Sequence, residues 1–412
     1  MPLSFFIDWS ILHGMKRLQA FRFELMPNGE QQRNMRRFAG SCRFVYNKAL
    51  ALQKENYDAK NKFIPYVVMA ANLVKWKKEP TLNWLKQSPS QTLQHALKDL
   101  ERAYKNFFAQ RANYPKFKRK GQGDSFRFPQ GFKVEQQNSR IFLPKLGWLR
   151  YRNSRDILGE ACNVTVSSRQ GKWFVSVQTE QEVEAPVTQA TSAIGIDVGI
   201  VRFATMSDET FFEPLNSFKH NQARLGRYQL RMKNKVKFSS NWRKLKNKIQ
   251  QVHGKIANAR KDFLHKITTT LSKNHALVCI EDLQVRNMSK SSKGNSEQHG
   301  KKVKQKSGLN RSILDQGWGE FRRQLDYKLS WNGGILLPVP PHNTSKTCPC
   351  CHHVSKDNRK TQEKFLCVVC GYKNNADVVG AINVLERGYR LLACGESVQL
   401  GRSVKQEPAE AS

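Results

Sequence analysis

Four cysteines in the C-terminal part of the sequence have the spacing of a zinc site. Cys348 and Cys351 form one C-x₂-C pair, and Cys367 and Cys370 form a second pair after an interval of fifteen residues. This spacing is typical of proteins in which four thiolates hold one tetrahedral Zn²⁺. Because four thiolates leave no open coordination position, it predicts a structural zinc and not a catalytic one.

Other side chains near these pairs offer alternative ligands. Cys350, His352 and His353 could each take one position, although two complete C-x₂-C pairs favour the four-cysteine set. In the simpler interpretation, both histidines are solvated loop residues. The chain has nine cysteines, an odd number with five in one short stretch, which indicates a metal site in a reducing compartment and not a disulfide framework.

Three acidic residues stand at the ends of predicted elements in an otherwise basic chain. Asp197 lies near the end of one apolar strand, Glu281 ends a second, and Asp377 begins the helix after the cysteines. Brought together by the fold, they could bind two Mg²⁺ or Mn²⁺ ions about 4 Å apart. Such ions activate water and stabilise the charge that develops on a scissile phosphate.

Each carboxylate also has a simpler interpretation. A strand-terminal Asp197 is often only a turn former, and Asp377 could be the N-cap of its helix. Asp282 is an alternative to Glu281, but side chains alternate along a strand, so the two carboxylates point to opposite sides. We favour Glu281 because it continues the apolar strand directly.

The composition indicates a polyanionic partner. The 412 residues include 70 Lys and Arg against 33 Asp and Glu, a net charge of +37. Nucleic acid is the favoured partner, with an anionic membrane surface and a merely basic soluble protein as alternatives. A hydrophobic share of 39% argues against disorder of the whole chain. There is no run of 18 apolar residues and residues 1–12 lack the pattern of a signal peptide, so we expect a cytoplasmic protein without a membrane partner.

The N-terminal half alternates between strands and helices. Residues 16–25 have strand patterning, residues 31–110 are mostly helical, and residues 132–181 are rich in strands. The first strand could join the later ones in one sheet, which makes the helical part an insertion. Residues 182–192 have the composition of a linker.

The C-terminal half has the pattern of a second α+β unit. Its longest predicted helix covers 241–271, and residues 284–308 are polar, without periodicity, and predicted to be a mobile loop. The other predicted elements are strands at 193–196, 201–206, 211–212, 276–280 and 335–339, and helices at 311–331 and 376–386.

With these residues assembled, the chain resembles the TnpB family. These OrfB-type proteins of insertion sequences are RNA-guided DNA endonucleases related to type V CRISPR effectors. The resemblance extends over most of the chain, from about Met15 to Cys394. Its motifs are Phe38–Asn47 (FAGSCRFVYN), Ala103–Phe108 (AYKNFF), Leu143–Trp148 (LPKLGW), Ile194–Ile200 (IGIDVGI), Asp262–Thr268 (DFLHKIT), Asp315–Phe321 (DQGWGEF), Asn375–Val384 (NADVVGAINV) and the four cysteines.

The resemblance implies an α+β multidomain fold whose catalytic, Mg²⁺-binding positions are Asp197, Glu281 and Asp377. It combines a wedge β-barrel, interrupted by a helical recognition bundle, with a RuvC-like domain of ribonuclease H fold that contains a zinc ribbon. The implied parts are a disordered or artefactual extension at 1–15, the barrel at 16–28 and 129–185, the recognition lobe at 29–128, the RuvC-like domain at 186–341 and 374–395, the zinc ribbon at 342–373 and a disordered tail at 396–412.

The implied function is RNA-guided cleavage of DNA. A guide RNA from the end of the element would direct a monomer, in a prokaryotic cytoplasm and associated with the nucleoid, to duplex DNA next to a short flanking motif. Two alternatives stay open: a nuclease-inactive RNA-guided DNA-binding regulator, and a transposase that acts directly on DNA.

Three basic segments are candidates for nucleic-acid contacts. Residues 216–261 contain fourteen Lys and Arg and no acidic residue, which suits a surface that binds the phosphate backbone of a guide–target duplex. Residues 114–120 interleave Tyr114 and Phe117 with Lys116, Lys118, Arg119 and Lys120, as expected for RNA stacking. The lysines of 289–306 could form a lid beside Glu281. For the first two segments, the alternative is a solvated basic surface.

Overall fold

The computed structural model describes residues 15–295 and 299–393, which form two compact units that divide after Glu184. The predicted tail at 396–412, and the predicted N-terminal extension up to residue 14, lie outside the described residues. Within the described residues, no helix is both long enough and apolar enough to cross a membrane.

The first unit is built on a seven-stranded sheet in the order β2-β6-β7-β1-β5-β4-β3. Strand β1 (Met15–Met26) buries Phe21, Phe23 and Leu25 on one face, as its alternation predicts, and pairs antiparallel with β7 and β5. The first strand therefore does join the later ones, and the helices are an insertion. The other strands are β2 (Ser125–Phe128), β3 (Lys133–Glu135), β4 (Arg140–Leu143), β5 (Gly147–Tyr151), β6 (Glu160–Arg169) and β7 (Lys172–Val183).

The sheet does not close into the predicted barrel. Strands β2 and β3 are its two edges, and no ladder joins them within the described part of the chain. The physical reason lies in their length: β2 has four residues and β3 has three, so neither offers a long edge for pairing.

The inserted helices have their own core. Helix α1 (Gly29–Asp58) begins with a capping box between Asn28 and Gln31, and buries Phe38, Val45 and Ala49, which recur at helical spacing. Its buried face packs against that of α3. The remaining elements are α2 (Tyr66–Lys78), the 3₁₀ helix η1 (Pro80–Gln87) and α3 (Ser90–Phe108).

The second unit is built on a five-stranded mixed sheet in the order β10-β9-β8-β11-β12. Strand β9 is antiparallel to both of its neighbours, β10 and β8, whereas β8, β11 and β12 run parallel. The strands are β8 (Ser192–Val198), β9 (Ala204–Met206), β10 (Phe211–Phe212), β11 (His275–Glu281) and β12 (Ile335–Val339).

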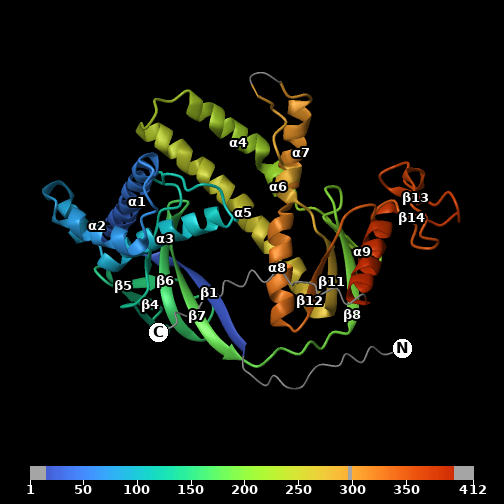
Figure 1. Cartoon of the computed structure of the whole chain (residues 1–412), viewed down its shortest axis with the longest axis horizontal. Coiled ribbons are helices and arrows are strands. Elements are labelled where there is room, and N and C mark those ends of the chain that lie inside the picture. Colours follow the sequence, from blue (N-terminus) through green and yellow to red (C-terminus); the bar gives the residue numbers. More distant parts are fainter. Residues whose placement is uncertain (1–14, 296–298, 394–412) are drawn as a thin grey trace. The chain divides into compact units, whose positions relative to one another are not determined.

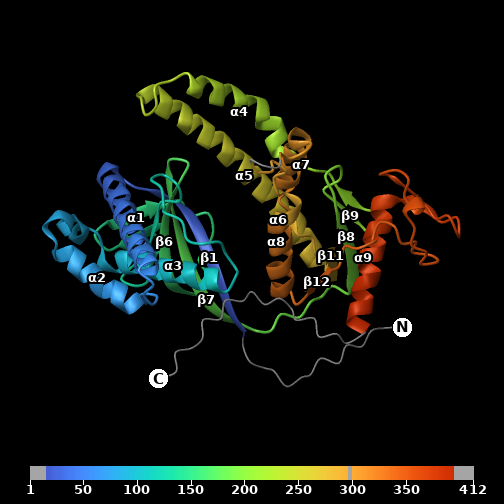
Figure 2. The same cartoon turned by 45° about the horizontal axis from the view of Figure 1, so that its top comes forward.

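Helices cover both faces of this sheet. Ile194 and Ile196 of β8 pack with α5 (Ser240–Asn274) and α8 (Trp318–Trp331), whereas Gly195 faces α9 (Ala376–Ala393). Figure 2 shows α8 and α9 on opposite sides of the strands. Because side chains alternate along a strand, Asp197 shares the α9 face with Gly195.

Three helical details differ from the sequence predictions. Gly317, with φ of 78°, divides the predicted helix 311–331 into α7 (Val303–Gln316) and α8, since the left-handed conformation ends a helix. The predicted loop 284–308 contains α6 (Val285–Met288) and the start of α7. Helix α4 (Ser217–Lys233) was not predicted because only Ser217 and Leu225 are buried, which leaves no apolar stripe.

The contact between β8 and α9 requires a glycine. A Cβ atom on Gly195 would lie 2.1 Å from the carbonyl oxygen of Ala381. We expect Gly195→Ala to lower the free energy of unfolding by roughly 1–3 kcal/mol through overpacking, measured by urea denaturation. The control is Gly226→Ala in α4, where no atom lies within 4 Å and where alanine should stabilise the helix by about 0.5–1 kcal/mol. Equal effects of the two variants would contradict this packing argument.

Candidate metal centres and basic surfaces

The four predicted cysteines converge. The sulfur atoms of Cys348, Cys351, Cys367 and Cys370 all lie within 4.8 Å of one another, which confirms them as one cluster. The amide N–H of Gly371, whose φ is 73°, donates to the carbonyl of Cys367 and closes the second turn. Four sulfurs in this arrangement are the donor set that Zn²⁺ prefers, so the residues present fit a structural zinc.

The alternative ligands lie outside the cluster. Cys350 is exposed, and Nδ1 of His352 lies 3.6 Å from Glu386 in α9. The carbonyl of His353 accepts a hydrogen bond from the Cys348 amide. Backbone N–H groups of Cys370 and Val369 lower the pKa of the Cys367 thiol to about 6, which favours the thiolate that a metal requires.

Asp197 and Glu281 lie at the same edge of the second sheet. Strands β8 and β11 are parallel neighbours with Ile196 opposite Ile280, so the next residue of each strand is one of the two acids. The parallel register therefore positions these carboxylates side by side, from segments far apart in the sequence.

Asp377 joins them from the first turn of α9. A Cβ atom on Gly380, one turn further along, would lie 2.9 Å from Oδ2 of Asp197. The missing side chain thus lets the Asp197 carboxylate rest on the turn that carries Asp377. Oδ1 of Asn375 accepts hydrogen bonds from the amides of Asp377 and Val378, at 2.9 and 3.4 Å, so Asn375 caps the helix and the N-cap interpretation of Asp377 is wrong.

The electrostatics of the three acids are coupled. Burial first, and then the charges of Glu281 and Asp377, raise the pKa of Asp197 to about 7, while Arg359 opposes this shift. Burial also raises the pKa of Glu281. Carboxylates with raised pKa values at a strand edge are typical of sites that receive a cation.

Two further side chains hold the acids in place. Arg359 lies between the cysteine pairs, and its Nη2 is 3.1 Å from Oδ1 of Asp377. The hydroxyl of Thr344 donates to Oε1 of Glu281 at 2.6 Å. Neither residue is predicted from the sequence, because neither is a metal ligand by type and the partner of each lies in another element.

The acids are neighbours but are not as tightly gathered as the cysteines. Among residues 15–295 and 299–393, only the cysteine cluster has three or more candidate ligand atoms all within 4.8 Å of one another. Like charges repel one another, and Arg359 and Thr344 each hold one of the acids in its position. Asp282 points elsewhere and pairs with Arg322.

The raised pKa of Asp197 predicts a pH dependence of stability. Between its ordinary value of 3.8 and about 7, the folded chain holds a proton that the unfolded chain has released. The free energy of unfolding due to this group therefore falls as the pH rises from about 4 to 7. In buffer without Mg²⁺, we expect the melting temperature to drop more between pH 5 and 7.5 for the wild type than for Asp197→Asn. Identical drops would refute the burial of this carboxyl.

The basic segment 216–261 forms a helical hairpin. Helices α4 and α5 pack through Leu225, Val252 and Ile256, which leaves most of the cations on the outside, whereas Arg260 pairs with buried Asp315. Beside this small core lies a pocket of about 500 Å³, lined by Arg231, Asn234, Lys235, Asn241, Lys244, Leu245 and Lys248.

The aromatic segment 114–120 lies against α1. The side chain of Asn47 bonds both the N–H and the C=O of Lys118, and Nζ of Lys54 lies 5.0 Å from the Phe117 ring. Tyr114 and Phe117 stay 38% and 47% exposed, so part of each ring is free for stacking. In the predicted lid, Lys306 donates to the carbonyl of Met288, and α7 begins at Val303, which shortens the loop.

Family models match three parts of the chain. Residues 176–292 match OrfB of IS605, described as “Probable transposase”, and residues 318–384 match the TNB domain of Cas12f1-like proteins. Residues 15–62 match a helix-turn-helix domain, although the structure there is strand β1 followed by the single helix α1.

Similar proteins cover nearly the whole chain. “Putative RNA-guided DNA endonuclease InsQ” of Escherichia coli (strain K12) is 60% identical over 96% of this chain and 98% of its own length. A protein of the same description from Streptomyces pristinaespiralis is 35% identical over 96% and 97%. Cas12f1, solved in complex with sgRNA and target DNA, is 12% identical, covers 90% of this chain and 98% of its own, and shares the fold with a TM-score of 0.55. The chain therefore belongs to the IS605 OrfB family, whose members include the TnpB proteins.

Proposed function

We propose that this protein is an RNA-guided DNA endonuclease of an insertion sequence. The observation that carries the proposal is the meeting of Asp197, Glu281 and Asp377 at one sheet edge, in a chain 60% identical to a relative of that description. Three acids at one edge would serve metal-assisted hydrolysis of a phosphodiester, which is a role that a protein that only binds DNA does not need.

The three carboxylates would hold a pair of divalent ions, Mg²⁺ or Mn²⁺. Bound there, the ions supply Lewis acidity and a water of lowered pKa. Asp197 is the acid on which the charges of both others act. Thr344 fixes the direction of Glu281, and Arg359 fixes that of Asp377, so the protein sets the positions of its ligands before substrate arrives.

The finer architecture is part of the proposal. The antiparallel-then-parallel order of the second sheet supports a RuvC-like domain of ribonuclease H fold at 186–341 and 374–395, with a zinc ribbon at 342–373. The first sheet, at 16–28 and 129–185, would be the wedge domain, and the helices within 29–128 the recognition lobe.

The partners would be a guide RNA from the end of the element and duplex DNA next to a short flanking motif. The α4–α5 hairpin, with its fourteen cations, would bind phosphates of the guide–target duplex, and segment 114–120 would bind RNA. We place the protein in the prokaryotic cytoplasm, at the nucleoid.

The experiment is programmed cleavage. The full chain is purified together with RNA transcribed from its own locus, and is incubated with Mg²⁺ and a plasmid library that has a guide-matched target beside a randomised flank. We expect cleavage only with RNA, and only next to one short motif. Cleavage without RNA would favour a nuclease or transposase that acts on DNA alone, and binding without cleavage would favour an inactive regulator.

Thr344 should affect cleavage without being a metal ligand. Removal of its hydroxyl in Thr344→Val frees Glu281 to rotate. Side chains that hydrogen-bond a metal ligand typically contribute 10- to 100-fold to metal affinity or activity. We therefore expect cleavage to slow by roughly 10-fold, with partial rescue at high Mg²⁺. The matched control is Thr347→Val in the same loop, whose hydroxyl bonds only the carbonyl of Asn343. Equal slowing by both variants would assign the effect to loop stability.

A further inference from the structure

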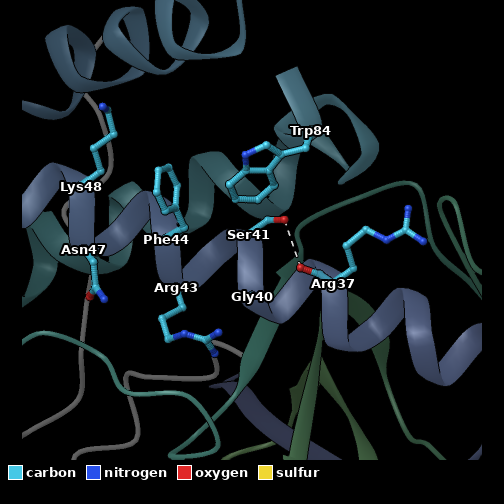
Figure 3. Close-up of a pocket in the computed structure, with 8 residues that line it drawn as sticks. All are labelled: Arg37, Gly40, Ser41, Arg43, Phe44, Asn47, Lys48 and Trp84. Atoms are coloured by element: carbon cyan, nitrogen blue, oxygen red, sulfur yellow. Dashed lines mark hydrogen bonds between the residues drawn. The ribbon is translucent and has the colours of Figure 1, made fainter. Parts of the chain in front are cut away.

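A pocket on helix α1 is not part of the carboxylate site or of the two basic segments. Its volume is about 680 Å³, and it lies within the first unit, between α1 and η1. Figure 3 shows its lining residues, which are Arg37, Gly40, Ser41, Arg43, Phe44, Asn47, Lys48 and Trp84.

One wall of the pocket is aromatic. The rings of Phe44 and Trp84 meet edge to face, with their centroids 5.1 Å apart, and Trp84 remains 37% exposed. Leaving a tryptophan this exposed forgoes part of the free energy of its burial. An exposed indole face is a surface on which an unpaired nucleic-acid base stacks, whatever its sequence.

The floor of the pocket is bare backbone. Gly40 lies inside α1, where glycine costs about 0.5–1 kcal/mol relative to alanine. A Cβ atom there would meet only Nη2 of Arg43, at 3.7 Å, so packing does not require the glycine. Figure 3 shows Gly40 between the aromatic rings on one side of the helix and Arg43 on the other. The missing side chain leaves open the space beside Arg43.

Cations lie at both ends of the aromatic wall. Arg37 bonds only neutral partners, Oε1 of Gln87 and Oδ1 of Asn34, and Nζ of Lys48 lies 5.3 Å from the Trp76 ring. Within the described ranges, neither side chain forms a salt bridge, whereas Arg43 pairs with Asp124 at 2.7 Å. Two cations without a carboxylate partner suit the phosphates on either side of a stacked base.

We propose that this pocket holds one unpaired base of the guide RNA, stacked on Trp84 beside Phe44, with the flanking phosphates on Arg37 and Lys48. The assignment to RNA rests on the proposed function. The pocket lies on the same helix as Asn47, which anchors segment 114–120, so one strand could follow both.

The test measures binding of a fluorescein-labelled 16-nucleotide oligo(U) RNA to the full chain freed of nucleic acid. Loss of one stacked base costs about 1–3 kcal/mol, so Trp84→Ala should weaken binding roughly 5- to 150-fold, and Trp84→Phe should retain most of it. Arg37→Gln should reduce the slope of log K against log salt by about 0.7. The control is Tyr57→Ala, an exposed aromatic of α1 outside the pocket, with affinity expected within twofold of wild type.

A second measurement does not depend on any variant. RNA that carries 5-iodouridine should cross-link in the wild type to the peptides of Phe44 or Trp84. The proposal would be overturned if Trp84→Ala bound oligo(U) with unchanged affinity, or if it lost as much affinity for duplex RNA as for oligo(U). Cross-linking only by DNA that carries 5-iododeoxyuridine would also overturn it. Binding of RNA in this pocket does not use the carboxylates. A chain that passes this test but cuts no DNA would therefore refute the proposed nuclease activity and still support the base-binding pocket.

Discussion

Asp197→Asn is expected to abolish DNA cleavage while guide RNA and target DNA stay bound. Asparagine keeps the size of the side chain but removes a charge that lies next to both other acids. The ligand set would then lose affinity for a second divalent ion, and the several kcal/mol that metal ions contribute to the transition state would be lost. We expect the rate of cleavage to fall at least about 1,000-fold, measured in single turnover with excess ribonucleoprotein.

Asp282→Asn is the matched control for this variant. Asp282 follows Glu281 directly but pairs with Arg322, with its side chain 44% exposed. Its replacement should change the cleavage rate less than threefold. If Asp282→Asn abolished cleavage and Asp197→Asn did not, the catalytic acids would have to lie on the side of β11 that carries Asp282.

Removal of the metal from the cysteine cluster is the second large effect that we expect. Structural zinc contributes about 10–16 kcal/mol to the folding of small zinc modules, far more than any single contact in this region. Arg359, between the cysteine pairs, holds Asp377, and strand β14 (Lys373–Asn375) leads directly into α9. Cys367→Ser should therefore lose bound zinc and also cleavage, although Cys367 is not one of the proposed Mg²⁺ ligands.

Cys350→Ser distinguishes this effect from the general removal of a thiol. Cys350 lies between the ligands of the first pair and is exposed outside the cluster. We expect one zinc per chain by elemental analysis in the wild type and in Cys350→Ser, and less than half in Cys367→Ser. Zinc loss in Cys350→Ser, or full cleavage by a zinc-free Cys367→Ser, would contradict the predicted coupling.

The sequence predicted best where one short pattern determines the structure. The two C-x₂-C pairs predicted the cluster that the structure shows. The alternation of Phe21, Phe23 and Leu25 predicted β1, and the apolar stretches before Asp197 and Glu281 predicted β8 and β11. Local periodicity is sufficient for such elements because it reports which face is buried.

The sequence predicted less where partners come from distant segments. Nothing near Arg359 or Thr344 indicates an acidic partner, because each partner lies in another element. Helix α4 lacks an apolar stripe, and the break at Gly317 depends on one left-handed residue. Closure of the first sheet depends on pairing between its edge strands, which no periodicity within one strand reports.

The place of α9 in the chain has a consequence for translation. This helix covers one face of the second sheet, brings Asp377 to the strand edge, and comes last among the described elements. A nascent chain whose synthesis has stopped before α9 has an uncovered apolar face, with Cys279 and Leu337, and only two of the three acids. Because domains fold as they leave the ribosome, the proposed nuclease becomes competent only after α9 has been synthesised.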